Sequence, residues 1–188
     1  MRLLQASTFT PKRIFMKAII FIIGMISASC VHAKDYKNMT VPYVDLERFS
    51  GSWYVQGHTH LWLDKGAVNQ IEHYDLVADD KIDITFSYFK DFESEQSVQN
   101  PKAKVVDLES NAHWKVQFLW PFKSDFLVVR LEENYEWTVI SVPKKNLIWI
   151  MSRDKVMDDG LYQEIVADLG GESFKVEALD RVPQVWNE

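Results

Sequence analysis

The chain has 188 residues, of which 47% are hydrophobic and 13% aromatic, so its length and composition fit one folded domain and argue against disorder. It carries 21 basic and 27 acidic side chains, and the first 33 residues hold four of the basic ones and no acid. The remainder therefore has 17 basic against 27 acidic side chains, a balance that repels phosphate backbones and disfavours nucleic-acid binding.

The N-terminal segment has the three-part layout of a secretory signal. After Met16, Lys17 precedes the apolar run Ala18–Ile26, and small residues follow it. The run is too short to anchor the protein across a bilayer. The sequence leaves open whether translation starts at Met1 or at Met16.

Two processing sites compete at the end of this segment. The sequence VHA, ending at Ala33, suits a type I signal peptidase and predicts a signal peptide over 1–33 and a mature domain over 34–188. The sequence SASC, ending at Cys30, resembles a lipobox with Ser27 in place of the usual aliphatic residue, and predicts a signal over 1–29 with a lipidated Cys30. Either route exports the protein, to the periplasm or, through a lipid anchor, to the outer membrane.

Cys30 is the only cysteine, so the mature chain has no disulfide and no thiolate for a metal or for catalysis.

Short segments of alternating hydrophobic residues recur along the rest of the chain. In the clearest one, Ile82–Phe89, every second residue is hydrophobic, a period of two that is typical of strands. Clusters of turn-forming residues separate the segments, so each strand is expected to be antiparallel to the next. The eight predicted strands are Trp53–Thr59, Asn69–Val77, Lys81–Tyr88, Ala103–Leu108, His113–Trp120, Asp125–Leu131, Glu136–Val142 and Leu147–Arg153.

One helix is predicted after the strands, over Met157–Leu169. It has aspartates in its first turn, apolar residues at four-residue spacing, and Gly170 and Gly171 to end it. A last strand-like piece spans Phe174–Leu179. This order predicts an all-β fold, an eight-stranded antiparallel up-and-down β-barrel with one C-terminal α-helix packed on it. A two-sheet sandwich is the alternative, because periodicity does not reveal closure.

Several motifs, in order and at fitting spacing, carry a resemblance to a known family. Gly51-Ser52-Trp53-Tyr54 resembles the G-x-W signature at the first strand of lipocalins, and Tyr135 matches the family's turn before the seventh strand. Leu147–Arg153 resembles the third motif, a strand that ends in arginine. The lead-in Val41–Phe49 and the segment Lys115–Phe122, KVQFLWPF, are similar to those of bacterial lipocalins of the outer-membrane lipoprotein Blc type.

The resemblance implies a structural role for four residues, Gly51, Trp53, Tyr135 and Arg153. Gly51 would let the chain turn sharply into the barrel, and Trp53 would fill the closed end. The guanidinium of Arg153 would lie across the indole in a cation–π contact. These residues are therefore expected to hold the fold and not to touch a ligand.

The ligand cavity is expected on the inward faces of the strands. Alternation places Ile82, Ile84, Phe86 and Tyr88 in one inward row. It places Trp114, Val116 and Phe118, on the strand that starts at His113, in a second inward row. Aligning Tyr74 with the family's inward tyrosine turns Gln70 and Glu72 inward, although Glu72 facing water at the rim is the alternative. Trp62, in the loop over the barrel mouth, is either a lid residue or simply exposed. The predicted cavity residues are Glu72, Tyr74, Ile84, Phe86, Tyr88, Trp114, Val116 and Phe118.

No motif indicates catalysis or a metal. There is no G-x-S-x-G, H-E-x-x-H or Gly-rich phosphate loop. His58, His60 and His73 could together bind zinc, but no fourth ligand stands at ligand spacing, so we predict no metal, no cofactor and no catalytic residue. The sequence therefore predicts an exported carrier, monomeric or homodimeric, for a hydrophobic or amphiphilic small molecule such as a fatty acid or lysophospholipid. The alternatives are an enzyme built on the same barrel and an envelope interaction protein with a filled barrel.

Overall fold

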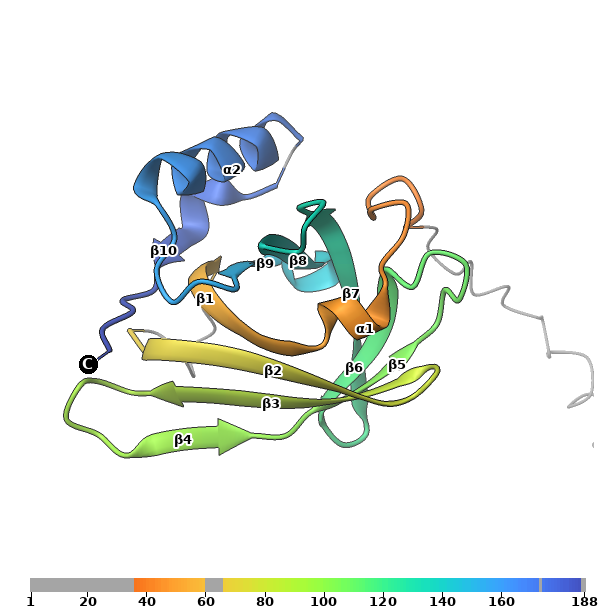
Figure 1. The fold of residues 1–188 in the computed structure, drawn as a ribbon, viewed down its shortest axis with the longest axis horizontal. Coiled ribbons are helices and arrows are strands. Elements are labelled where there is room, and N and C mark those ends of the chain that lie inside the picture. Colours follow the sequence, from red (N-terminus) through yellow and green to blue (C-terminus); the bar gives the residue numbers. More distant parts are fainter. Residues whose placement is uncertain (1–35, 60–65, 173, 187–188) are drawn as a thin grey trace, which may run out of the picture. The chain divides into compact units, whose positions relative to one another are not determined.

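Eight strands close into an antiparallel barrel in the computed structural model, which describes residues 36–59, 66–172 and 174–186 (Figure 1). Neighbouring strands pair in chain order, and pairing between the first and last strands closes the barrel. The predicted barrel is confirmed, and the sandwich alternative is excluded by this closure. The barrel strands are β1 (Gly51–Thr59), β2 (Val68–Ala78), β3 (Lys81–Phe89), β5 (Lys102–Val105), β6 (His113–Leu119), β7 (Phe122–Leu131), β8 (Trp137–Val142) and β9 (Leu147–Ser152).

Two further strands extend the sheet beyond the eight predicted ones. The strand β4 (Gln96–Gln99) pairs with the last residues of β3, whereas β5 pairs with the first residues of β3. Pro101 lies between β4 and β5 and interrupts them because it has no N–H to donate. The strand β10 (Leu179–Arg181) pairs with the end of β1. The strand-like piece predicted over Phe174–Leu179 is wrong, because a 3-10 turn, η3 (Val176–Ala178), occupies half of that range and β10 starts only at Leu179.

The boundaries of several elements differ from the predictions. The helix α2 spans Asp159–Gly171, so both glycines expected to end it lie in its last turn. It starts after Asp158 because that side chain caps it, accepting a hydrogen bond from the backbone N–H of Leu161. A short helix, α1 (Leu46–Phe49), was not predicted from the sequence. In the part of the chain that the structure describes, no helix has the length and apolarity needed to cross a membrane.

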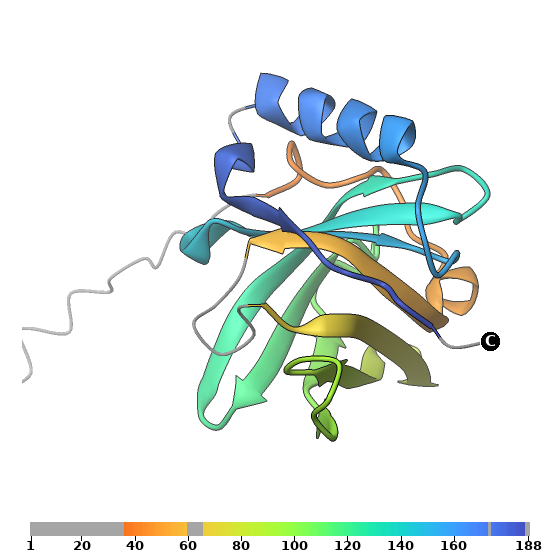
Figure 2. The ribbon, with the colours of Figure 1, turned by 90° about the vertical axis from the view of Figure 1, so that its left-hand side faces the viewer.

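The helix α2 lies along the outside of the barrel (Figure 2). Its buried face packs on outward-facing residues of β7, β8 and β9, which explains why these strands are apolar on both faces. The helix approaches β1 so closely that a Cβ on Gly57 would come within 2.3 Å of the Tyr162 hydroxyl. The helix and the strands beneath it form a cluster of buried side chains on the outside of the barrel. Its members are Tyr36, Leu127, Val129, Val139, Ile148, Ile150, Met157, Tyr162, Ile165 and Leu169.

One end of the barrel, hereafter the floor, is sealed by Trp53 and Arg153. The indole of Trp53 is fully buried, and the Arg153 guanidinium lies 3.8 Å from its ring centroid. Arg153 also donates hydrogen bonds to the backbone carbonyls of Arg48, Phe49, Ser50 and Ser52, at 2.7–3.0 Å. The side chain of Arg153 thus fixes the turn from α1 into β1. Its guanidinium stacks on the indole of Trp53, as the family resemblance implies.

The other two residues of the predicted structural signature lie beside this contact. Gly51 has φ of +96°, and a Cβ there would lie 3.3 Å from a guanidinium nitrogen of Arg153. The hydroxyl of Tyr135 accepts a hydrogen bond of 2.8 Å from the backbone N–H of Asp45, the N-cap of α1. The guanidinium of Arg48 stacks over the Tyr135 ring at 4.1 Å. All four signature residues therefore meet at the floor.

A buried carboxylate ties the start of the described chain to the outside of the barrel. Asp125 on β7 is 4% exposed, accepts a hydrogen bond of 2.8 Å from His113, and forms ion pairs with Lys115 and Lys144. The ring of Tyr36 contacts His113 edge-on at 5.3 Å. Burial by itself would raise the pKa of Asp125, but the hydrogen bonds from Lys115 and His113 outweigh it and lower the pKa to about 2.

Replacing Arg153 with methionine is expected to reduce the free energy of unfolding by about 2 to 4 kcal/mol, because the cation–π contact and several charge-assisted hydrogen bonds are lost together. Urea unfolding measures the change, and Lys155→Met, at an exposed position two residues away, is the matched control. Ligand affinity of the folded variant should stay within about twofold of the wild type, because the floor is far from the open end. Unchanged stability with lost ligand binding would contradict this role.

The stability contributed by Asp125 is expected to disappear in acid. Its pKa is about 2 in the folded protein and about 3.9 in the unfolded chain, so the contribution is complete above pH 4 and is lost as the pH falls toward 2. At about 1.4 kcal/mol per pKa unit, this difference in the pKa of Asp125 corresponds to about 2.5 kcal/mol. Unfolding free energies of wild type and Asp125→Asn, measured between pH 2 and pH 7, should converge in this window. Parallel curves for the two proteins would show that Asp125 is not the group that titrates.

Candidate ligand-binding site

The inward faces of the barrel strands form a largely apolar lining. In β3 every second residue is buried, as alternation predicts, and Ile84, Phe86 and Tyr88 all point inward. Most of the lining belongs to one cluster of buried side chains that runs from the floor around the barrel wall, whereas Phe86 and Tyr88 form a separate small cluster with Ala67. The members of the large cluster on the strands include Val55, Tyr74, Ile82, Ile84, Ala103, Val105, Trp114, Val116, Phe126, Val128, Ile140, Val142, Leu147, Trp149 and Met151.

The predicted cavity residues lie at different depths in this lining. Tyr74 and Trp114 belong to the floor, where their rings meet Phe49 edge-on, each at 5.3 Å. Phe86 and Tyr88 stack at 5.1 Å in the half of β3 nearer the open end. Ile84 pairs with Tyr74, and Val116 lies between Ala103 and Ser124 in the strand register. Phe118 is 48% exposed and lies at the rim.

Glu72 points into the barrel and is paired there. Its side chain is 4% exposed and its carboxylate accepts a hydrogen bond from the hydroxyl of Tyr74. The alternative that Glu72 faces water at the rim is therefore wrong. Burial, followed by the charge of Glu72 and this hydrogen bond, raises the pKa of Tyr74 well above its usual value. Tyr74 thus stays protonated and serves as a donor to Glu72.

A second polar pair, Gln70 and His58, lies closer to the open end. The Nε2 atoms of the two side chains are 3.1 Å apart, and Gln70 Nε2 also donates to the carbonyl of Ala67 at 3.3 Å. Gln70 Oε1 is buried and has no hydrogen-bond partner among the described residues. A buried amide oxygen without a donor is unfavourable, so this acceptor fits a guest molecule or a water inside the barrel.

The inward position of His58 did not follow from the sequence. Strict alternation from Trp53 would turn His58 outward, but the register with β9 shifts between Val55 and Gly57. This bulge leaves Gly57 facing α2 and places His58 opposite Trp149, on the inner face. A one-residue register shift moves every later side chain to the other face, and hydrophobicity alone carries no signal for it here.

The zinc-binding arrangement considered for the histidines is wrong for the two that the structure describes. His73 faces outward, where its ring nitrogens lie 2.8 Å from Ser52 Oγ and 3.2 Å from Asp75 Oδ1. His58 faces inward, so the two cannot share an ion, and His60 lies outside the described residues. Within the described ranges, no group of three or more potential metal ligands occurs. Trp62 and Cys30 also lie outside them.

The wall of the barrel divides at the open end, hereafter the mouth. The half of β3 near the floor pairs with β5, which in turn pairs with β6. The half of β3 near the mouth pairs with β4 instead. Over the described residues β4 pairs with β3 alone, so β4 and the end of β6 diverge (Figure 1). The strands are therefore joined less tightly at the mouth than at the floor.

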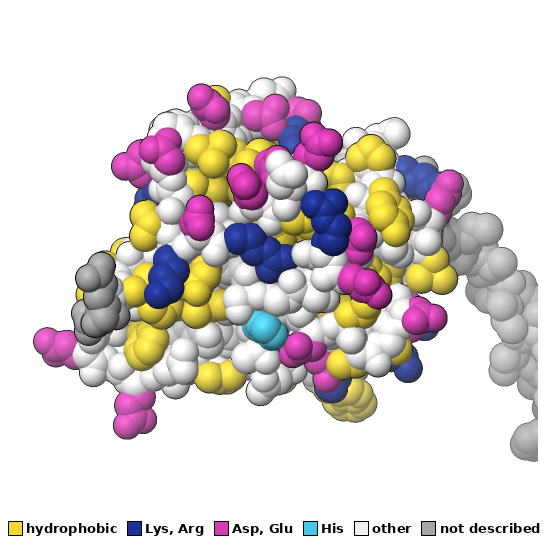
Figure 3. Space-filling view, viewed as in Figure 1, with side chains coloured by type: hydrophobic (Ala, Val, Ile, Leu, Met, Phe, Trp, Pro, Cys, Tyr) yellow, Lys and Arg dark blue, Asp and Glu magenta, His cyan; other side chains and the backbone are white. Residues whose placement is uncertain are grey.

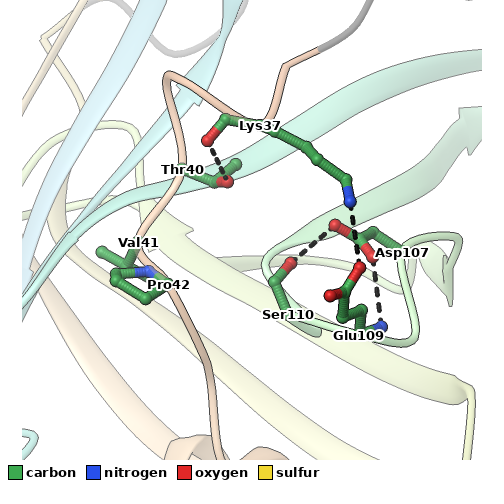
Figure 4. A pocket seen from close by; sticks show the side chains of 7 residues that line it. All are labelled: Lys37, Thr40, Val41, Pro42, Asp107, Glu109 and Ser110. Carbon is green, nitrogen blue, oxygen red and sulfur yellow. Dashed lines mark hydrogen bonds and ion pairs between the residues drawn. The ribbon is translucent and has the colours of Figure 1, made fainter.

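A small surface hollow lies outside the barrel, near the loop between β5 and β6. Its volume is about 170 Å³, and polar side chains that already bind one another form much of its wall (Figure 4). Lys37 Nζ lies 2.9 Å from Glu109, and Ser110 Oγ donates to Asp107 at 2.8 Å. The lining of the hollow consists of Lys37, Thr40, Val41, Pro42, Asp107, Glu109 and Ser110.

Known proteins share both the sequence pattern and the fold. A family model described as a lipocalin-like domain matches residues 44–184. The chain is 29% identical to outer membrane lipoprotein Blc of Citrobacter freundii over 141 residues, which cover 74% of this chain and 79% of that protein. It is 22% identical to the protein of the same name from Vibrio cholerae over 170 residues, covering 90% of this chain and 99% of that one.

Among solved structures, insecticyanin from the tobacco hornworm Manduca sexta superposes with a TM-score of 0.59 at 14% identity, covering 80% of this chain and 85% of that one. This likeness shows that the fold is shared. The family match spans most of the barrel and includes the signature residues at the floor. The chain therefore belongs to the lipocalin-like family, whose barrels bind small hydrophobic ligands, and it is similar to bacterial lipocalins of the Blc type.

Proposed function

We propose that the protein is an exported carrier that holds an amphiphile with a long apolar chain, such as a fatty acid or a lysophospholipid. Its biological role would be the storage or transport of envelope lipids. Family membership and the apolar inward faces support this function. Burying the alkyl chain would supply the affinity, at roughly 25 cal/mol per Å² of apolar surface removed from water.

The buried oxygen of Gln70 is the observation that carries the proposal. It is an unsatisfied acceptor inside an otherwise apolar barrel, which is the arrangement expected where a ligand supplies the missing donor. A hydroxyl or ammonium hydrogen of a head group could fill this role.

The distribution of polar groups supports one orientation of the ligand. The floor is closed by the aromatic rings of Phe49, Trp53, Tyr74 and Trp114, and the carboxylate of Glu72 at this depth is already bonded to Tyr74. The pair of Gln70 and His58 lies nearer the mouth. The described part of the apolar lining contains no lysine or arginine that could neutralise an anion at depth. The alkyl chain would therefore enter first, and a charged head group would remain near the mouth.

Membrane attachment through Cys30 is part of the proposal. Two relatives carry the name outer membrane lipoprotein, and SASC, ending at Cys30, resembles a lipobox. Cells grown with labelled palmitate are expected to incorporate label into the wild-type protein and not into Cys30→Ser. Label in neither protein would favour cleavage after Ala33 and a soluble periplasmic form.

Filling the barrel is expected to abolish ligand binding without unfolding the protein. Ala103 faces inward on β5 beside Ile82 and Val116, so Ala103→Phe would occupy space proposed for the alkyl chain. Native mass spectrometry of the gently purified protein should show a bound lipid that this variant lacks. Titration with lysophospholipid, followed by tryptophan fluorescence, should show affinity lowered more than about tenfold.

The matched control is Lys104→Phe, which adds the same ring on the outer face of the same strand. It should bind lipid like the wild type. If the barrel is instead filled by its own side chains, Ala103→Phe will lose about 1 to 3 kcal/mol of stability through overpacking, and neither protein will carry lipid. That result would support the alternative of a filled barrel and overturn the carrier function.

A further inference from the structure

The hairpin between β6 and β7 exposes a group of large apolar side chains at the mouth. Leu119 is 71% exposed, Trp120 82% and Phe122 72%, and Phe118 beside them is half-exposed. We call these four residues the apolar tip. The hairpin projects beyond the neighbouring strands in Figure 2, and Figure 3 shows hydrophobic side chains protruding at the lower edge, where Figure 1 places this hairpin.

The apolar tip is not explained by the fold. Leu119 and Phe122 face each other across the hairpin, but their exposed fractions show that nothing in the described chain covers them. Single exposed hydrophobic residues are common on protein surfaces, whereas a contiguous group of this kind marks a surface that binds another apolar phase.

Along the sequence of the hairpin, the apolar tip is accompanied by a basic residue and by no acidic one. The segment from Gln117 to Ser124 has no acidic residue, in a chain with 27 of them, and its only charge is Lys123. The 3-10 turn η2 (Pro143–Lys145), which packs near β7 at the same end of the barrel, adds the exposed Lys144 and Lys145. Lys144 also pairs with Asp125 at 3.5 Å but remains 68% exposed.

We propose that the apolar tip inserts into the surface of a phospholipid bilayer that contains anionic lipid. Tryptophan and phenylalanine are favoured at the level of lipid head groups, and lysines beside them can reach the phosphates. A protein partner fits less well, because a hairpin tip of four side chains falls short of the roughly 800 Å² that each side of a stable interface buries.

Docking through the apolar tip would place the mouth against the membrane. An amphiphile could then pass between bilayer and barrel without exposing its alkyl chain to water. The side chains of the apolar tip are exposed to solvent at the end of the hairpin, so their contact with a bilayer does not require that the barrel hold a lipid. Vesicle binding and ligand binding can therefore succeed or fail separately.

Binding to vesicles of phosphatidylethanolamine and phosphatidylglycerol tests the proposal. Every variant carries Cys30→Ser, so that no acyl chain at this position holds the protein on the lipid. Leu119→Ser and Trp120→Ala together should lower the partition coefficient more than about tenfold in a sedimentation assay. The matched control is Leu108→Ser, which replaces a leucine that is 67% exposed in the loop between β5 and β6, at the floor end. It should bind like the parent.

A second measurement locates the contact. Lipids brominated on their acyl chains should quench part of the tryptophan fluorescence, and Trp120→Phe should remove most of that quenching while vesicle binding is retained. The proposal would be overturned if the parent and the Leu119→Ser, Trp120→Ala variant bound vesicles equally well. It would also be overturned if Leu108→Ser lowered the partition coefficient as much as the changes at the apolar tip. Concentration-dependent self-association that Leu119→Ser abolishes, without binding to vesicles, would instead assign the apolar tip to a second copy of the chain.

Discussion

The structure depends on the contact that closes the floor of the barrel. Arg153 stacks on the buried Trp53 and at the same time satisfies four backbone carbonyls where the chain turns from α1 into β1. An arginine can do both because its guanidinium is planar, always charged, and carries donors in a fixed fork. This contact joins the last barrel strand to the first, so it fixes the entry of the chain and the closure of the sheet together.

A sealed floor confines function to the remaining interior and the mouth. Inside, the polar groups occur in pairs, Glu72 with Tyr74 at depth and His58 with Gln70 nearer the mouth. Buried polar groups cost stability unless they are hydrogen-bonded, so pairing explains how an apolar barrel tolerates them. Gln70 Oε1, which has no hydrogen-bond partner among the described residues, stands where a head group is proposed to lie. Among the described inward residues, the unsatisfied acceptor therefore lies nearer the mouth, while the aromatic floor is compatible with the alkyl end of a ligand.

Much of this arrangement could be predicted from the sequence, because a strand with one buried face repeats every two residues. The inward row on β3 and the signature residues at the floor followed from alternation and motif spacing. The strand β4 did not, because Gln96–Gln99 contains one hydrophobic residue and packs little of its surface. The inward turn of His58 depends on a bulge, and the burial of Glu72 depends on Tyr74 as its partner; neither is visible in a hydrophobic pattern. Alternation also assigned Phe118 to the cavity wall, whereas it lies half-exposed at the rim, as part of the apolar tip.

The net negative charge of the domain opposes the self-association that the apolar tip would otherwise favour. A protein with four adjacent exposed apolar side chains would tend to associate through them, but 27 acidic residues against 17 basic ones beyond the first 33 make copies of the domain repel each other. The same charge would repel the body of the protein from an anionic bilayer. The hairpin itself adds no acid between residues 117 and 124, where its one charge is Lys123, and the nearby turn η2 adds Lys144 and Lys145. Charge distribution alone thus favours an approach to the membrane with the hairpin first and the mouth facing the lipid.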